Sequence, residues 1–262
     1  MGALHAGHLA LVEYAVNQRQ TMNAGPVVVT VFVNPTQFGP TEDFGKYPRT
    51  LEHDLALCDR AGADAVFAPS VVEIYPDGPE SAYQPALPAV AREPQLEEAH
   101  RPTHFAGVLK VVHRLFTLVR PREAVFGEKD YQQLLAIVAM AKSEALGVEI
   151  TGRPTVRDPD GLALSSRNVY LSPTQRNRAL GLSRALQEAK RADTPEEAER
   201  AMRSLLLAHQ VSIDYAVVRD AESLRPIESF DRDRPVRALI AGRVANTRLI
   251  DNAAIPVGSS RR

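Results

Sequence analysis

The stretch PVVVTVFVNPTQF, residues 26–38, is the strongest indication of the fold. Its first eight residues form an apolar run rich in valine, without the alternation of a half-exposed strand, which is typical of a parallel-sheet strand buried on both faces. Ligands of open α/β sheets bind beyond the carboxyl ends of the strands. Asn34 and Gln37, which follow this strand, are therefore candidate substrate-binding residues, although a simple Asx-type turn before Pro35 gives the same pattern.

Strands and helices alternate on the carboxyl side of this stretch. We expect helices at residues 49–61, 105–119 and 131–146, and strands at residues 64–68, 123–126 and 148–151. This alternation predicts an α/β fold with a doubly wound, parallel, Rossmann-like sheet. In the first of these helices, Leu51, Leu55 and Cys58 are spaced i, i+4, i+7, which predicts an apolar buried face with a core thiol.

The pattern changes after about residue 168. A helix is expected to open at Ser172-Pro173, and a second helix, rich in Ala, Glu and Arg, is expected to face solvent. That second helix covers residues 192–208, and strands follow at residues 212–219, 235–243 and 248–255, the last two antiparallel. We therefore predict a Rossmann-like domain at residues 1–155 and a smaller C-terminal α+β domain, acting as a lid, at residues 156–262. Residues 75–103 form the longest irregular stretch.

The chain opens with MGALHAGH, residues 1–8, followed by apolar residues at helical spacing. An HxGH loop at a helix N-terminus suits a phosphate, because backbone N–H groups, the helix dipole and two imidazoles converge there. In a doubly wound fold such a loop follows a central strand. No strand precedes this loop, so we expect the first strand to be missing from this chain, either because it lies upstream of Met1 or because the sheet lacks it.

Two further segments carry groups that suit a nucleotide. In FGEKDYQQ, residues 126–133, Lys129 offers a point charge for a phosphate, and Gln133 lies about one helical turn after Asp130. In DGLALSSRN, residues 160–168, two serine hydroxyls accompany Arg167, which suits bidentate phosphate contact. Residues 126–133 are alternatively a solvated charged loop. Residues 160–168 are alternatively an interdomain linker.

Composition limits the possible partners. The 262 residues have a net charge of −1, with 24% charged and 44% hydrophobic residues, so the basic excess typical of nucleic-acid-binding proteins is absent. Cys58 is the only cysteine, no apolar run reaches about 18 residues, and no signal-peptide pattern is visible. We therefore expect no nucleic-acid partner, no membrane span and a cytoplasmic location.

Several motifs together carry a family resemblance. FVNPTQF, YPR at residues 47–49, RPTHFAGV at residues 101–108, FGEKDYQQ and DGLALSSRN occur in this order along nearly the whole chain. Together they resemble the pantothenate synthetases (pantoate–β-alanine ligases). The HxGH and Ser-Ser-Arg pair is similar to the HIGH and KMSKS motifs of the wider nucleotidyltransferase superfamily.

This resemblance implies an activity and a set of site residues. The implied reaction joins (R)-pantoate to β-alanine with ATP and Mg²⁺, through a pantoyl-adenylate, releasing pyrophosphate and AMP; a homodimer is implied as well. The implied ATP-binding residues are Met1, Gly2, Ala3, Leu4, His5, Ala6, Gly7, His8, Gly127, Glu128, Lys129, Asp130, Val156, Leu164, Ser165, Ser166 and Arg167. Among these, His5, His8, Lys129 and Arg167 are the expected catalytic residues, with His8 at the position of the proton donor. Gln37 and Gln133 stand at family positions that contact pantoate. The position of Gln37 also contacts β-alanine.

Two further positions depart from the family pattern. Leu164 stands where methionine is common, which keeps size and polarity similar. Glu52-His53-Asp54 stands where adjacent aspartates are associated with Mg²⁺, so Asp54 is the one candidate metal ligand, and Mg²⁺ is expected to arrive on the ATP phosphates. Two other functions stay open: a related nucleotidyltransferase that ends at a nucleotide-linked product, and a truncated, non-catalytic nucleotide-binding protein.

Overall fold

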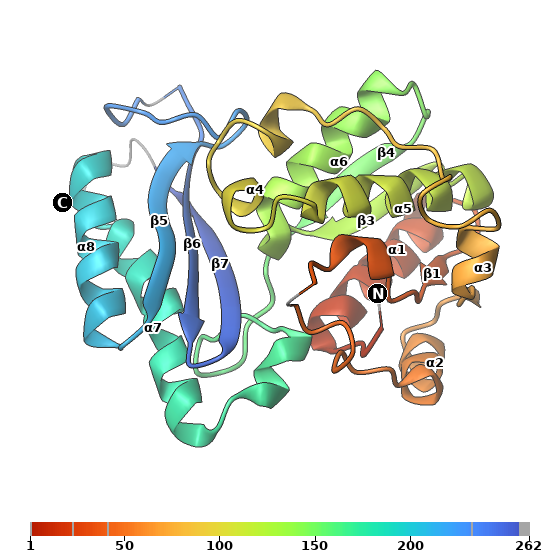
Figure 1. The fold of residues 1–262 in the computed structure, drawn as a ribbon, viewed down its shortest axis with the longest axis horizontal. Helices are drawn as coiled ribbons and strands as arrows, with labels where there is room; N and C mark the ends of the chain where they lie inside the picture. Colours follow the sequence, from red (N-terminus) through yellow and green to blue (C-terminus); the bar gives the residue numbers. More distant parts are fainter. Residues whose placement is uncertain (1, 23, 41, 232, 257–262) are drawn as a thin grey trace. The chain divides into compact units, whose positions relative to one another are not determined.

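The computed structural model describes residues 2–22, 24–40, 42–231 and 233–256 (Figure 1). The chain divides into two compact units. Unit 1 comprises the residues up to Glu128 together with Gln132–Val156, and unit 2 comprises Lys129–Tyr131 together with the chain from Arg157 onward.

Unit 1 is an α/β unit with parallel strands. Its helices are α1 (Ala6–Met22), α2 (Leu51–Arg60), α3 (Val71–Ile74), α4 (Glu97–His100), α5 (His104–Val119) and α6 (Tyr131–Ser143). Its strands are β1 (Val28–Thr30), β2 (Ala65–Phe67), β3 (Glu123–Gly127) and β4 (Glu149–Arg153), which form the parallel pairs β1–β2 and β3–β4. The predicted α/β class with parallel strands is confirmed. Its main core joins α5, α6 and the strands β2, β3 and β4 through residues such as Leu109, Ile137 and Met140, all fully buried.

Two details of unit 1 differ from the expectation. Strand β1 covers three residues of the predicted eight, and Val28 is 37% exposed. Among the described residues β1 pairs with β2 alone, and its other two residues, Val29 and Thr30, are only half-buried. In α2, Cys58 is buried as predicted, but Leu51 and Leu55 are 46% and 43% exposed. The inward face of α2 is instead Asp54, Leu57 and Cys58, because the carboxylate of Asp54 has partners inside the unit.

The long stretch at residues 75–103 is more ordered than its prolines suggest. It contains a 3₁₀ turn at Ala89–Ala91 and the short helix α4. Tyr75 and Leu96 are 2% and 0% exposed, so the stretch contributes side chains to the core of unit 1.

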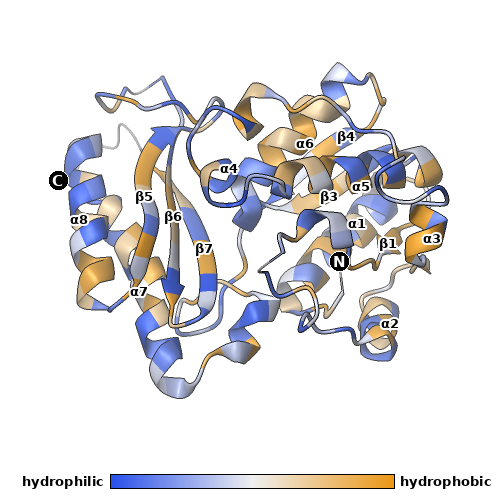
Figure 2. Ribbon diagram, in the orientation of Figure 1, coloured by the Kyte–Doolittle hydropathy of each residue, from blue (hydrophilic) through white to orange (hydrophobic). Residues whose placement is uncertain are grey.

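Unit 2 packs two helices on one face of an antiparallel sheet. The helices are α7 (Pro173–Ala189) and α8 (Pro195–Ala208), and the sheet has the order β5 (Ser212–Asp220), β6 (Val236–Val244), β7 (Thr247–Ile255). The predicted antiparallel pairing of the last two strands is confirmed. The prediction that the second helix faces solvent is wrong: Ala198, Met202 and Leu206 of α8 are fully buried in the core. Their i, i+4, i+8 spacing makes an apolar stripe along a helix that also carries charged residues. Figure 2 shows both hydrophilic and hydrophobic positions on α8.

Candidate active site

The N-terminal loop arranges its two imidazoles through the backbone. The N–H of Gly7 donates to Nδ1 of His5, and the N–H of His5 donates to Nδ1 of His8, each at 3.2 Å. A backbone N–H can only donate, so both Nδ1 atoms accept and the proton of each neutral ring sits on Nε2. Helix α1 begins at Ala6 and has no acidic side chain in its first turn. The loop thus combines two Nε2–H donors with the positive end of a helix.

Asp54 of α2 anchors this loop. Its carboxylate accepts the N–H of Ala3 at 2.9 Å, the N–H of Leu4 at 2.8 Å and the hydroxyl of Thr50 at 3.1 Å, and the residue is fully buried. Ala3 has a φ of +53°, in the left-handed region that non-glycine residues adopt at a cost. The hydrogen bonds to Asp54 stabilise that conformation. Burial, and then the charge of Asp54, raise the pKa of the neighbouring Cys58 thiol.

The family resemblance implies that this loop binds ATP. Replacing Asp54 with alanine is then expected to raise the KM for ATP at least about tenfold, because Ala3 and Leu4 would each keep a backbone N–H without its acceptor. An unsatisfied buried donor costs about 1–3 kcal/mol, so the melting temperature should also fall by several degrees. Steady-state kinetics and thermal unfolding measure both. Asp59→Ala, on the exposed face of the same helix, is the matched control. ATP kinetics like those of the unmodified enzyme in a stably folded Asp54 variant would contradict this role.

Asn34 is the centre of a buried network that shapes the NPTQF turn. The residue is 3% exposed, and its Oδ1 accepts the Thr36 N–H, the Thr36 hydroxyl and the Tyr75 hydroxyl. Its Nδ2 donates to Oε1 of Gln37 at 3.2 Å and to the carbonyl of Gly107 at 3.0 Å. Burial raises the pKa of the Tyr75 hydroxyl. The network fixes the turn and one end of the Gln37 amide.

The RPTHFAGV motif packs against the same turn. Nδ1 of His104 lies 3.2 Å from the carbonyl oxygen of Gln37, and Arg101 pairs with Glu42 at 2.7 Å. Gly107 of α5 lies against the backbone of the turn, since a Cβ built there would stand 2.2 Å from the carbonyl oxygen of Thr36. The sequence analysis did not predict these supporting roles of Arg101 and Gly107. The one local indication was that several polar residues stand close to a glycine at the start of a predicted helix.

Residues of the FGEKDYQQ segment divide between the units. Gly127 ends β3, and Glu128–Asp130 form a 3₁₀ turn before α6. Lys129 is partly exposed, and its backbone carbonyl accepts Nδ2 of Asn252 at 2.8 Å. Gln133 is partly exposed, whereas its neighbour Gln132 is buried and bonds to the N–H of Glu97.

The DGLALSSRN loop has a rigid base. Gly161 has a φ of +93°, a conformation that favours glycine, and the carboxylates of Asp158 and Asp160 both pair with Arg176 of α7. Ser165 caps a 3₁₀ turn at Ser166–Tyr170, its hydroxyl accepting the N–H of Arg167. The serines and Arg167 are all partly exposed.

The predicted site residues are thus grouped as follows. Unit 1 holds the described loop residues from Gly2 to His8, together with Asn34, Gln37, Asp54, Gly127, Glu128, Gln133 and Val156. Unit 2 holds Lys129, Asp130, Leu164, Ser165, Ser166 and Arg167. Met1 lies outside the described residues.

Comparison with known proteins identifies the family. A family profile described as pantoate-beta-alanine ligase matches residues 1–254. The chain belongs to the pantoate–β-alanine ligase family. It is 50% identical to the pantothenate synthetase of a Nocardioides species over 99% of this chain and 78% of that protein. It is also 50% identical to the pantothenate synthetase of Rubrobacter xylanophilus, over 98% of this chain and 89% of that protein.

Solved structures of this family share the fold. Pantothenate synthetase from Thermus thermophilus superposes with a TM-score of 0.89 at 47% identity, covering 98% of this chain and 91% of that one. The Francisella tularensis pantoate–β-alanine ligase, solved with beta-gamma ATP and β-alanine, superposes with a TM-score of 0.76 at 32% identity, covering 98% of this chain and 88% of that one. Family membership makes the chain a ligase with a Rossmann-like fold. No helix in the described ranges is both long and apolar enough to cross a bilayer.

Proposed function

We propose that this enzyme condenses (R)-pantoate with β-alanine at the expense of ATP, through a pantoyl-adenylate, and releases pyrophosphate and AMP. The observation that supports this most strongly is the family match over residues 1–254. The HxGH geometry agrees with it, because two Nε2–H donors at a helix N-terminus suit a phosphate chain.

In the first step, the carboxylate of pantoate attacks the α-phosphorus of ATP, and the bond to the pyrophosphate oxygen breaks. Negative charge builds on the phosphoryl oxygens, so catalysis requires positioned donors and cations more than covalent chemistry. We assign this role to His5, His8, Lys129 and Arg167, with His8 as the proton donor. Ser165 and Ser166 contribute hydroxyl donors for phosphate oxygens.

In the second step, the amine of β-alanine attacks the acyl carbon of the adenylate, and AMP leaves. We propose that Gln37 and Gln133 bind pantoate through their amides, and that Gln37 also contacts β-alanine. Asn34 serves this site indirectly, because its polar atoms are bonded to Thr36, Gln37, Tyr75 and Gly107. Its hydrogen bond to Oε1 of Gln37 orients the Gln37 amide.

We assign no direct magnesium ligand to the protein. No group of three or more His, Cys, Asp or Glu side chains that could hold a metal ion occurs among the described residues. The oxygens of Asp54 already accept three hydrogen bonds from the N-terminal loop and Thr50, so we assign Asp54 a structural role. We propose that Mg²⁺ enters as part of the MgATP substrate, held by phosphate oxygens.

A coupled assay of pyrophosphate and AMP release tests the function. Sustained release of both products, with pantothenate formed, should require pantoate, β-alanine and ATP together, whereas a single turnover of pyrophosphate release should need only pantoate and ATP. Pyrophosphate release that needs pantoate but not β-alanine, with no amide formed after β-alanine is added, would favour a nucleotidyltransferase. No pyrophosphate under any combination would favour a non-catalytic nucleotide-binding protein.

Organisation beyond the site follows the family resemblance. We propose a homodimer in the cytoplasm, with residues 1–155 binding ATP and pantoate and residues 156–262 acting as a lid. The lone thiol at Cys58, buried and not in a disulfide, suits a reducing compartment. Small-angle scattering of the enzyme measures its mass, and a lid requires the profile to become more compact when a non-hydrolysable adenylate analogue is added.

A further inference from the structure

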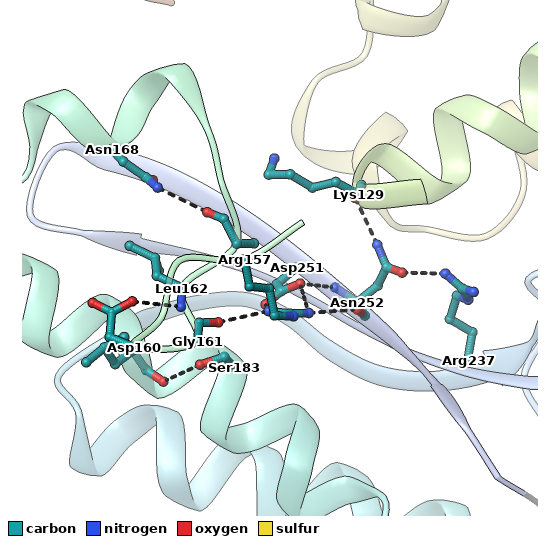
Figure 3. A network of polar contacts seen from close by, with 12 residues as sticks. Lys129, Arg157, Asp160, Gly161, Leu162, Asn168, Ser183, Arg237, Asp251 and Asn252 are labelled. Carbon is teal, nitrogen blue, oxygen red and sulfur yellow. Dashed lines mark hydrogen bonds and ion pairs between the residues drawn. The ribbon is translucent and has the colours of Figure 1, made fainter. Parts of the chain in front are cut away.

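Two consecutive polar residues lie buried on the edge strand β7. Asp251 and Asn252 are 3% and 4% exposed, in a sheet whose other buried residues are mostly apolar. Side chains of neighbouring strand residues point to opposite faces, so the pair can reach two separate segments. Figure 3 shows both residues at the centre of one network of polar contacts.

Asn252 holds the Lys129 segment. Its Nδ2 donates to the backbone carbonyl of Lys129 at 2.8 Å, and its Oδ1 accepts Nη1 of Arg237 at 2.6 Å. The guanidinium of Arg237 stacks on Tyr131, 3.7 Å from the ring centroid, and the Tyr131 hydroxyl donates to the carbonyl of Ala221. The carbonyl of Lys129 and the side chain of Tyr131, two residues later, are therefore both held by residues of unit 2.

Asp251 holds the base of the other loop. Its carboxylate accepts both terminal nitrogens of Arg157, at 2.6 and 2.9 Å. The Nη1 of Arg157 also donates to the carbonyl of Gly161 at 3.2 Å (Figure 3). Arg157 and Ala163 form an antiparallel bridge, and Nδ2 of Asn168 donates to the carbonyl of Ala163. The two ends of the Ser-Ser-Arg loop are thereby tied to β7.

A backbone bond joins the two halves of this network. The N–H of Asn252 donates to Oδ1 of Asp251 at 2.8 Å, so displacing one residue disturbs the other. We propose that Asp251 and Asn252 are positioning residues that hold Lys129 and the Ser165–Arg167 segment in a fixed relation for the phosphates of ATP. This inference rests on the proposed function, which assigns those two segments to ATP. It gives Asp251 and Asn252 no contact of their own with the nucleotide.

Asn252→Ala tests the inference through ATP kinetics. Losing the bond to the Lys129 carbonyl is expected to raise the KM for ATP about tenfold, with a change of less than about threefold in the KM for β-alanine. The matched control is Asp214→Asn, which weakens a half-buried ion pair on the same sheet, where Nε of Arg248 lies 2.7 Å from Oδ2 of Asp214. Its ATP kinetics should stay within about twofold of the unmodified enzyme.

A double-mutant cycle with Lys129→Ala separates positioning from general stability. Lys129→Ala alone should slow adenylate formation at least about a hundredfold. Once Lys129 is absent, adding Asn252→Ala should lower kcat/KM for ATP by less than about twofold further. If the loss in kcat/KM of the double variant equals the product of the two single-variant losses, the inference is wrong. If Asn252→Ala does not fold, Asn252→Asp keeps the acceptor for Arg237, loses the donor to Lys129, and serves in the same cycle.

The outcomes also distinguish this inference from the proposed function. A strongly impaired Lys129→Ala enzyme together with a folded Asn252→Ala enzyme of unchanged ATP kinetics would overturn the positioning role alone. Unchanged ATP kinetics in Lys129→Ala would overturn the assignment of Lys129 to ATP, and the positioning role with it.

Discussion

Replacing His8 with alanine is expected to slow pantoyl-adenylate formation by at least about a hundredfold. The Nδ1 of His8 is engaged by the N–H of His5, so the substitution removes an Nε2–H donor at the positive end of α1. Losing one positioned donor to a developing oxyanion commonly costs about two to three orders of magnitude in rate. Quenched-flow measurement of pyrophosphate release in a single turnover reports this step directly.

Two further variants identify which nitrogen of His8 acts. The amide nitrogen of a glutamine lies near the place of imidazole Nε2, whereas that of an asparagine lies near Nδ1. We therefore expect His8→Gln to recover part of the lost rate and His8→Asn to recover none. His53→Ala, at an exposed position of α2, controls for the loss of an imidazole elsewhere. A fast His8→Ala enzyme, or recovery by asparagine alone, would refute the assigned geometry.

Local patterns in the sequence were sufficient to predict most of the helices and strands. A glycine between two histidines ahead of an apolar helix predicted the imidazole pair at the start of α1. Alternating strand and helix patterns predicted the parallel α/β class, and it is confirmed by the paired strands. These predictions succeeded because each depends on residues within one or two helical turns.

Predictions that depended on distant partners failed or were never made. Helix α2 turns Asp54 inward, against its apolar spacing, because the backbone donors to that carboxylate lie about fifty residues earlier. Helix α8 looked exposed by composition, yet three residues of one stripe decide its burial. The contact between Asn252 and Lys129 spans 123 residues, and nothing near either residue in the sequence indicates it.

The role of Gly107 illustrates how such a distant contact sets a requirement on a single residue. Helix α5 approaches the NPTQF turn so closely that a Cβ at this position would meet three backbone atoms. These are the carbonyl oxygen of Thr36 at 2.2 Å, its carbonyl carbon at 2.4 Å and Cα of Gln37 at 2.6 Å. Backbone atoms cannot rotate aside as a side chain can, so either the helix or the turn must move.

Gly107→Ala is therefore expected to lower kcat/KM for pantoate by about a hundredfold or more, because moving the turn displaces the amide of Gln37 that we assign to pantoate. The strain should also lower stability by about 1–3 kcal/mol. Gly45→Ala is the matched control, since a Cβ there meets nothing within 4 Å. Steady-state kinetics with varied pantoate and varied ATP, together with thermal unfolding, measure the effects.

Comparing the loss of kcat/KM for pantoate with that for ATP shows whether Gly107→Ala displaces the turn or loosens the whole of unit 1. A displaced turn predicts that the loss falls mainly on pantoate, since the HxGH loop is held by a different anchor, Asp54. Equal losses for pantoate and ATP would indicate a general loosening of unit 1 instead. If alanine prevents folding altogether, Tyr75→Phe, which removes one hydrogen bond to Oδ1 of Asn34, perturbs the same turn more gently. That variant should weaken pantoate kinetics several-fold, and unchanged pantoate kinetics would contradict the proposed link between this network and Gln37.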